Sequence, residues 1–307
     1  MDKEKSWYQK ISGEALLLLT AVIWGTGFVA QRKAMEGMQP FAFVALRFFL
    51  GCLVLLPFLL LRHKKSKFAE PESKLGSTWF KEKVLPGLVA GVFLFFGTSF
   101  QQLGIMTSTA SKAGFLTSLY LVLVPVIAMF FGKKSNRWVW IGVLLALTGV
   151  YFLSISERLT IQAGDVFLLL GTVFWALQIL ALDHYSQKTD SLSLAFGQFL
   201  FTAVTALVVS LLVENQGMIQ NSSAILPLLY SGFVAVGLAF TLQVFGQSKV
   251  DPALSALILS LEAIFALISG MIFLGERLSG REWFGSALML AAVLVVQLKG
   301  QQKKSLP

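Results

Sequence analysis

Apolar runs long enough to cross a lipid bilayer recur along nearly the whole chain. A helix that spans the hydrocarbon core needs roughly 20 mostly apolar residues. Ten runs meet this condition: 13–31, 41–61, 84–103, 110–131, 137–154, 164–183, 192–213, 224–245, 252–274 and 282–298. Because 56% of the residues are hydrophobic and only 13% are charged, little remains for a soluble domain. The sequence predicts an all-α integral membrane protein with ten transmembrane helices.

The basic residues indicate how these helices are oriented. The net charge is +9, but Lys and Arg are scattered among loops, which favours a membrane orientation signal over a nucleic-acid partner. With the N-terminus inside, cytoplasmic segments hold 18 Lys and Arg and the other side holds 6, while Arg47 inside the second run completes the 25. We therefore expect a multi-pass protein of the inner (plasma) membrane with both termini cytoplasmic.

The chain contains an internal repeat. At an offset of 151 residues, GEALLLLTAVIW (13–24) matches GDVFLLLGTVFW (164–175). Similar offsets align Gln102 with Gln243 and Trp140 with Trp283. This pattern predicts two five-helix repeats, residues 1–155 and 156–307. Because five is odd, the repeats have inverted topology, an arrangement typical of secondary transporters with a site near the midplane.

Short motifs in both halves resemble a known family. They are WGTGF at 24–28, Pro40 with LRF at 46–48, LEA at 261–263 and FLGERLS at 273–279. Their order and duplication resemble the EamA family of the drug/metabolite transporter superfamily. The resemblance implies export of a small metabolite such as an amino acid or a drug-like compound, driven by a proton gradient or by the substrate's own gradient. Gly132-Lys133-Lys134 and Trp175-Ala176 depart from the family's pattern.

A single carboxylate, Glu262, interrupts the apolar run 252–274. Ionisable residues inside a membrane are costly and usually face the bundle interior. Ser255, Glu262 and Ser269 are seven residues apart, so they share one face of a helix. We predict that Glu262 faces a central cavity near the midplane, where it binds and releases either protons as the coupling ion or a cationic substrate. The alternative is a neutral Glu262 that ties two helices together.

Seven further side chains complete the predicted substrate-binding site: Trp24, Arg47, Gln102, Tyr120, Trp175, Gln178 and Gln243. Trp24 and Trp175 lie at equal depth in repeat-related runs. They either form two walls of one cavity or pack between helices. Trp24 shares its helix face with the amide of Gln31, and Trp175 shares its face with that of Gln178. Arg47 either ties its helix to a neighbour or to lipid headgroups, or meets a substrate anion.

The remaining candidates are amides near the ends of runs and one tyrosine. Gln101, Gln102 and Gln243 end their runs, where they either line the two entrances or are ordinary amides at the membrane interface. Tyr120 is predicted to present its hydroxyl group to the cavity.

These residues predict a secondary transporter that binds a small molecule and needs no cofactor. A passive facilitator or lipid translocator of the same fold is an alternative. An intramembrane enzyme is disfavoured because the chain has no HExxH or GxSxG motif, and an ATP-driven pump because it has no phosphate-binding G-x-x-x-x-G-K-[ST] loop. The only cysteine, Cys52, lies inside the second run, so no intrachain disulfide is possible.

Overall fold

The computed structural model describes residues 12–66, 84–108, 110–133, 135–154, 163–215, 217–274 and 279–300. This part of the chain is helical and contains no strand, apart from one isolated bridge between Met38 and Ile219. The two chain termini and most of the basic loop that carries the orientation signal, residues 67–83, lie outside the described residues.

The helices follow the predicted apolar runs closely. In chain order they are α2 (Gly13–Ala34), α3 (Pro40–Ser66), α5 (Leu85–Ile105), α6 (Ala110–Ser118), α7 (Tyr120–Phe130), α8 (Arg137–Ser154), α9 (Ala163–Ser186), α10 (Ser191–Val213), η2 (Ser222–Ala224), α11 (Ile225–Leu229), η3 (Tyr230–Phe240), α12 (Thr241–Gln247), α13 (Pro252–Leu259), α14 (Glu262–Leu274) and α15 (Gly280–Gly300). Within the described residues, eight segments are long and apolar enough to cross a membrane, and α8 and α15 carry shorter apolar stretches, Arg137–Phe152 and Trp283–Val296.

Two predicted helices are each divided in two, which the sequence analysis did not anticipate. The run 110–131 forms α6 and α7, which are separated at Leu119. The run 252–274 forms α13 and α14, which are separated at Ser260 and Leu261. Around both breaks some backbone N–H groups bond three residues back instead of four, as from Val122 to Leu119 and from Ala263 to Ser260. Tyr120 and Glu262 are the first residues after the two breaks.

The eighth predicted helix is continuous but irregular. It begins with the single turn of η2 and continues through α11, η3 and α12 to Gln247. The middle segment, η3, is an 11-residue π-helix. A π-helix is wider than an α-helix and is rare over this length, and such segments occur often at functional sites.

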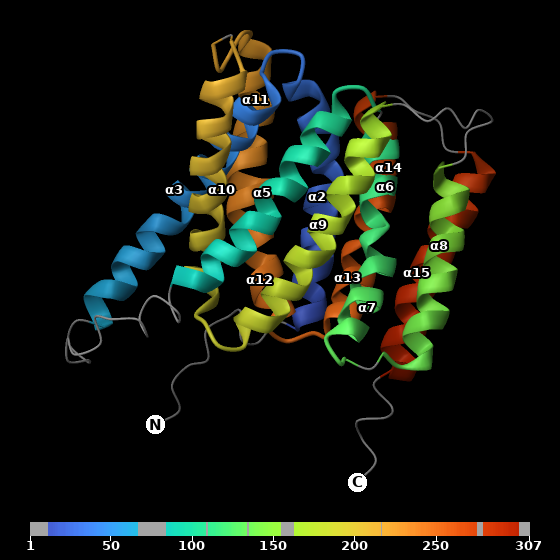
Figure 1. Cartoon of the computed structure of the whole chain (residues 1–307). Coiled ribbons are helices and arrows are strands. Elements are labelled where there is room, and N and C mark those ends of the chain that lie inside the picture. Colours follow the sequence, from blue (N-terminus) through green and yellow to red (C-terminus); the bar gives the residue numbers. More distant parts are fainter. Residues whose placement is uncertain are drawn as a thin grey trace.

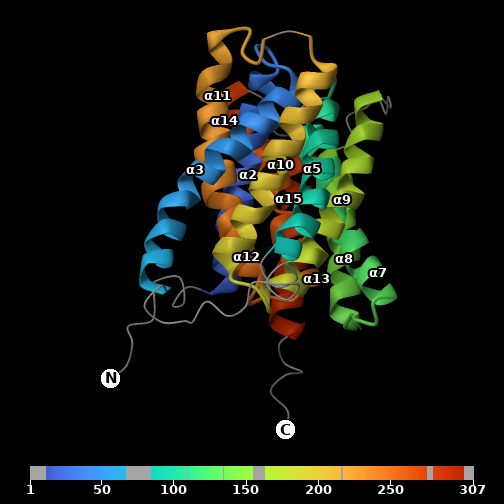
Figure 2. The ribbon, with the colours of Figure 1, turned by 60° about the vertical axis from the view of Figure 1, so that its left-hand side comes forward.

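Helices from the two ends of the chain interleave. α3, α10, α5 and α9 follow one another side by side in Figures 1 and 2, and each neighbouring pair is in contact. α2 packs on η3, α12 and α14, and α9 packs on α5, α6 and α7. α8 and α15 form a pair at one edge of the bundle (Figure 1). Most of the strong contacts therefore join the first 155 residues to the rest of the chain.

Small residues permit the closest of these contacts. A Cβ atom built on Gly87 of α5 would lie 2.9 Å from the Cα atom of Gly197 on α10, and one on Gly91 would lie 2.7 Å from the Cβ atom of Phe201. Because glycine has no side chain there, α5 and α10 approach backbone to backbone.

Candidate functional site

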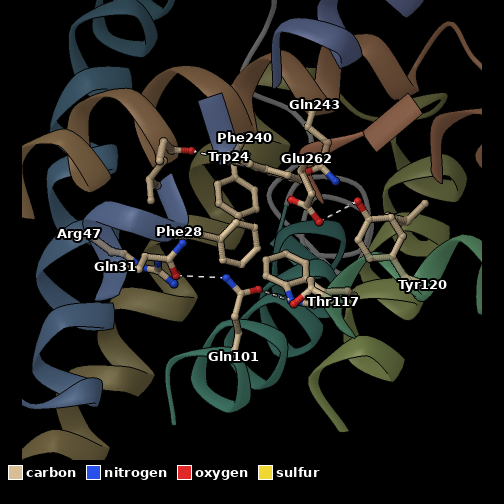
Figure 3. A pocket seen from close by; sticks show the side chains of 14 residues that line it. Trp24, Phe28, Gln31, Arg47, Gln101, Thr117, Tyr120, Phe240, Gln243 and Glu262 are labelled. Atoms are coloured by element: carbon tan, nitrogen blue, oxygen red, sulfur yellow. Dashed lines mark hydrogen bonds between the residues drawn. The ribbon is translucent and has the colours of Figure 1, made fainter. Parts of the chain in front are cut away.

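A small cavity lies in the middle of the bundle, among α2, α3, α5, α6, α7, α9, η3, α12 and α14 (Figure 3). It encloses about 30 Å³, room for about one or two water molecules. Its lining residues are Trp24, Phe28, Gln31, Arg47, Gln101, Thr117, Tyr120, Trp175, Ile179, Ala235, Val236, Phe240, Gln243 and Glu262. The cavity thus draws on both halves of the chain, and nearly all of its lining residues are buried in this conformation.

Three aromatic rings form its centre. The ring centroids of Trp24 and Trp175 are 6.0 Å apart, and Phe240 lies 4.5 Å from Trp24 and 5.8 Å from Trp175. The planes of Trp175 and Phe240 are nearly parallel, at 18°. Gly97 makes room for the indole of Trp175, because a Cβ atom at Gly97 would lie 3.3 Å from the ring. This packing provides an apolar surface for the body of an organic molecule.

The two indole N–H groups have different partners. Trp24 donates to the backbone carbonyl of Ala235 in the π-helix, at 3.2 Å. Trp175 donates to the side-chain oxygen of Gln101 at 2.9 Å, and the amide nitrogen of Gln101 donates to the side-chain oxygen of Gln31 at 3.1 Å. Trp175 therefore begins a chain of hydrogen bonds along the cavity wall, whereas Trp24 is tied to the backbone.

Glu262 begins α14, and its carboxylate faces the cavity. Its side chain is 3% exposed and accepts a hydrogen bond of 3.0 Å from the hydroxyl of Tyr120, the first residue of α7. This hydrogen bond therefore joins the two helix breaks on one side of the cavity. Gly25 of α2 lets the backbones approach, since a Cβ atom there would lie 2.7 Å from the carbonyl oxygen of Glu262.

Ser255 and Ser269 are buried as well, so the polar stripe of the run 252–274 lies inside the bundle.

Arg47 of α3 also lines the cavity and is only 4% exposed. Its guanidinium lies 5.1 Å from the ring centroid of Phe43 and 5.3 Å from that of Phe48. Among the described residues no carboxylate lies within salt-bridge distance of it, and its Nε atom has no hydrogen bond. Arg47 and Glu262 are thus two separate charged groups of one cavity, drawn on opposite sides in Figure 3.

The predicted amides occupy different places. Gln243 lines the cavity, whereas Gln178 is fully buried behind it and hydrogen-bonds to Gln243 and Gln198 at 3.1–3.3 Å. Gln102 is also fully buried, and its amide reaches the carbonyl of Gln31 at 3.5 Å. Gln101, Gln102 and Gln243 are all buried in this conformation, and Gln101 and Gln243 line the cavity. That they line the two entrances stays a prediction.

Several lining residues were missed by the sequence analysis: Phe28, Thr117, Ile179, Ala235, Val236 and Phe240. Apolar and small residues are abundant in every predicted run, so nothing in the sequence separated these from lipid-facing ones. Phe28 is the exception, since it lies one turn after Trp24 on the same helix face. The described residues contain no group of three His, Cys, Asp or Glu side chains that could hold a metal ion.

Comparison with known proteins shows which family shares this architecture. The model of the EamA-like transporter family matches residues 11–155 and again 162–298. The chain belongs to the EamA-like transporter family. A transporter of unassigned substrate from Archaeoglobus fulgidus is 36% identical over 293 residues, which cover 92% of this chain and 85% of the relative. This membership indicates a multi-pass membrane transporter of the drug/metabolite type.

More distant family members are similar over nearly their whole length. The inner membrane transporter YedA of Escherichia coli K12 is 24% identical, with 90% of this chain and 88% of YedA covered. A probable amino-acid metabolite efflux pump of Salmonella typhimurium is also 24% identical, with 91% and 93% covered. One solved crystal structure superposes with a TM-score of 0.71 at 19% identity, covering 95% of this chain and 99% of the other, which shows a shared fold. The family and the names of these relatives indicate a transporter and not an enzyme.

Proposed function

We propose that this EamA-like transporter carries a small organic metabolite across the inner membrane by alternating access, with the central cavity as its binding site. The observation that carries the proposal is that one small cavity with buried walls is built from helices of both halves of the chain. A rocking motion of one half against the other would open such a cavity to each side in turn. In this scheme we take the structure, with its small cavity and buried walls, as an occluded state.

The two halves are proposed to be inverted five-helix repeats, residues 1–155 and 156–307, with α8 and α15 as the fifth helix of each. The contacts support this, because each kind of contact occurs twice. The first helix of one half packs on the third helix of the other in both α2–η3 and α9–α5. Trp24 and Trp175 donate across these same two interfaces, to Ala235 and Gln101. The fourth helices are those that break at Leu119 and at Ser260.

Proton coupling is assigned to Glu262. A buried carboxylate in lipid has a cost in its charged form, so it binds a proton readily when the site is closed to water. Tyr120 and Arg47 are the other titratable or charged residues that line the cavity. Proton binding and release from opposite sides of the membrane would drive uphill export. The alternative interpretation of Glu262 as a neutral tie to Tyr120 remains, and the Glu262→Gln variant described below separates the two.

The substrate class is proposed to be an amino acid or a compound of similar size. The aromatic centre of the cavity and its two opposite charged groups suit an amphipathic solute. The name of the Salmonella typhimurium relative, a probable amino-acid metabolite efflux pump, agrees with this class.

Counterflow in proteoliposomes tests the function directly. Liposomes loaded with a high concentration of unlabelled amino acids would be diluted into traces of the same labelled compounds. A carrier accumulates label transiently because each unlabelled molecule that leaves returns the site to the outside. If the label only equilibrates, at a rate that does not depend on the internal concentration of unlabelled compound, the protein is a passive channel. If no compound exchanges, the proposed substrate class is wrong.

Both termini and the loop 62–83 are proposed to be cytoplasmic. A cysteine at Ser73 should react in intact cells only with membrane-permeant reagents, whereas one at Gln220, in the loop before η2, should react with impermeant ones. The unmodified chain is the control for Cys52, which is buried. The reverse pattern would overturn the orientation.

A further inference from the structure

The charge of Arg47 is balanced by no other described residue. The side chain is 4% exposed, lines the cavity, and makes no hydrogen bond or ion pair with any described group. Its neighbours are the rings of Phe43 and Phe48, which attract a cation only weakly compared with a carboxylate. A buried charge without a partner is unfavourable in a protein interior. The guanidinium is therefore available to a negative group that enters the cavity.

A second donor lies at the same cavity, and its direction is fixed by chemistry. The indole nitrogen of Trp175 can only donate, so the atom of Gln101 that it meets at 2.9 Å must be the amide oxygen. Gln101 then presents its NH₂ group to Gln31, whose oxygen accepts it at 3.1 Å. The chain of hydrogen bonds ends on the NH₂ group of Gln31, which makes no hydrogen bond to any described residue.

Gln31 and Arg47 are drawn on the same side of the cavity in Figure 3, away from Tyr120. This side presents hydrogen-bond donors, while the opposite side holds the carboxylate of Glu262.

We propose that Arg47 and Gln31 form a subsite for the anionic group of the transported solute, and that this group is a carboxylate. The inference rests on the proposed transport function and adds the substrate's chemistry to it. A planar guanidinium matches a carboxylate with two parallel hydrogen bonds. Arg47 is the only cation among the lining residues, so a singly charged group balances the site better than a phosphate. The solute is a small carboxylate with an apolar body that lies against Trp24, Trp175 and Phe240.

A structural role for Arg47 has less support. A side chain that reaches out to lipid headgroups would be exposed at its charged end, and a side chain that ties two helices would hydrogen-bond to the second helix. Arg32 shows what such a tie looks like, because its guanidinium donates to the carbonyls of Ile105 and Met106 at 3.0 and 2.7 Å. It lies outside the cavity lining and therefore provides a matched control.

The subsite is tested by ligand-induced thermal stabilisation of the purified full-length protein. The probes are matched sets that share one apolar body: leucine, 4-methylpentanoate and 3-methylbutylamine, together with phenylalanine, 3-phenylpropanoate and 2-phenylethylamine. In the wild-type protein we expect carboxylates of at least one set to raise the melting temperature and the matched amine not to. In Arg47→Gln the carboxylate should bind at least about tenfold more weakly, because a buried charge pair loses one partner. Arg32→Gln should keep the wild-type response.

The ligand-free stability provides a second readout. Arg47→Met keeps an unbranched apolar stem beside Phe43 and Phe48 and removes the guanidinium with its charge. If the guanidinium serves an incoming anion, this variant should melt at or above the wild-type temperature without ligand. A clear decrease in its melting temperature would contradict the subsite, because it would show that Arg47 stabilises the ligand-free protein.

The remaining outcomes separate the subsite from the transport function. The subsite is wrong if no carboxylate stabilises the wild-type protein, or if Arg47→Gln responds as the wild type does. If the amines alone bind and undergo counterflow in both proteins, the carrier function holds and the subsite fails. If carboxylates bind through Arg47 but none undergoes counterflow, the subsite holds and the carrier function fails.

Discussion

The two charged sides of the cavity differ in how they are satisfied. Glu262 has a partner within the protein, because the hydroxyl of Tyr120 donates to it at 3.0 Å. Arg47 has none among the described residues, and the amide of Gln31, drawn on the same side of the cavity in Figure 3, ends the hydrogen-bond chain as a donor without a partner among them. The carboxylate side is therefore complete without ligand, whereas the guanidinium side is complete only when an anion is bound. This difference suggests separate tasks, proton exchange at Glu262 and substrate binding at Arg47.

Neutralising the carboxylate should have the largest effect. Glu262→Gln keeps the shape of the side chain and an oxygen that accepts from Tyr120, but it cannot bind or release a proton. We expect uphill transport driven by a pH gradient to fall to the level of empty liposomes, while counterflow without a gradient is retained. The measurement is uptake by proteoliposomes with and without an imposed pH difference.

Wild-type uphill transport by a normally expressed Glu262→Gln protein would assign Glu262 to packing alone. Loss of counterflow together with uphill transport would instead assign the carboxylate to substrate binding, and the division of tasks between the two sides would be wrong.

Carboxylate binding at Arg47 and Gln31 should be sensitive to Trp175, where the hydrogen-bond chain that ends at Gln31 begins. Trp175→Phe leaves the oxygen of Gln101 without its fixed donor, so the amides of Gln101 and Gln31 are free to reverse. We expect binding of carboxylate probes to weaken by about tenfold, a loss of roughly 1.4 kcal/mol, since one oriented donor is lost. Isothermal titration of the purified variant measures this.

Trp24→Phe is the matched control for that variant. Its indole bonds to a backbone carbonyl, and it takes no part in the chain that ends at Gln31. Carboxylate affinity should therefore decrease less in Trp24→Phe than in Trp175→Phe. Equal losses in the two variants would show that both rings act only through packing.

Removing the hydroxyl of Tyr120 should have the smallest effect. Tyr120→Phe deletes one buried hydrogen bond to Glu262 and leaves the ring in place, which typically costs about 1 kcal/mol of stability. We expect a modest decrease in melting temperature and unchanged carboxylate affinity, because the change lies on the other side of the cavity. An affinity loss as large as that of Arg47→Gln would show that the two sides do not act separately.

The sequence predicted the features that depend on local composition. The long apolar runs were recognisable from their length and composition. The lone charges at Glu262 and Arg47 were recognisable because a charge in lipid is costly whichever residues surround it. The positions of the breaks at Leu119 and Ser260 were not predicted, because neither residue is a glycine or a proline. Pro125, which favours a bend in the run 110–131, lies inside α7, six residues beyond Leu119. The contact between Tyr120 and Glu262 joins residues 142 positions apart, so no local pattern reports it. Phe240 was missed as part of the aromatic centre because a phenylalanine side chain can equally well face the lipid.

The most direct test of the proposed alternating access is whether the cavity opens to both sides of the membrane. Thr117 lines the cavity, is 3% exposed and has a hydroxyl without a hydrogen-bond partner, so cysteine fits there with little disturbance. In a Cys52→Ala background, Thr117→Cys would be treated with an impermeant thiol reagent from the outside in one experiment and from the inside in another. We expect labelling from each side, slowed in both cases by a bound carboxylate. Labelling from one side only, or from neither, would contradict a carrier whose binding site is this cavity.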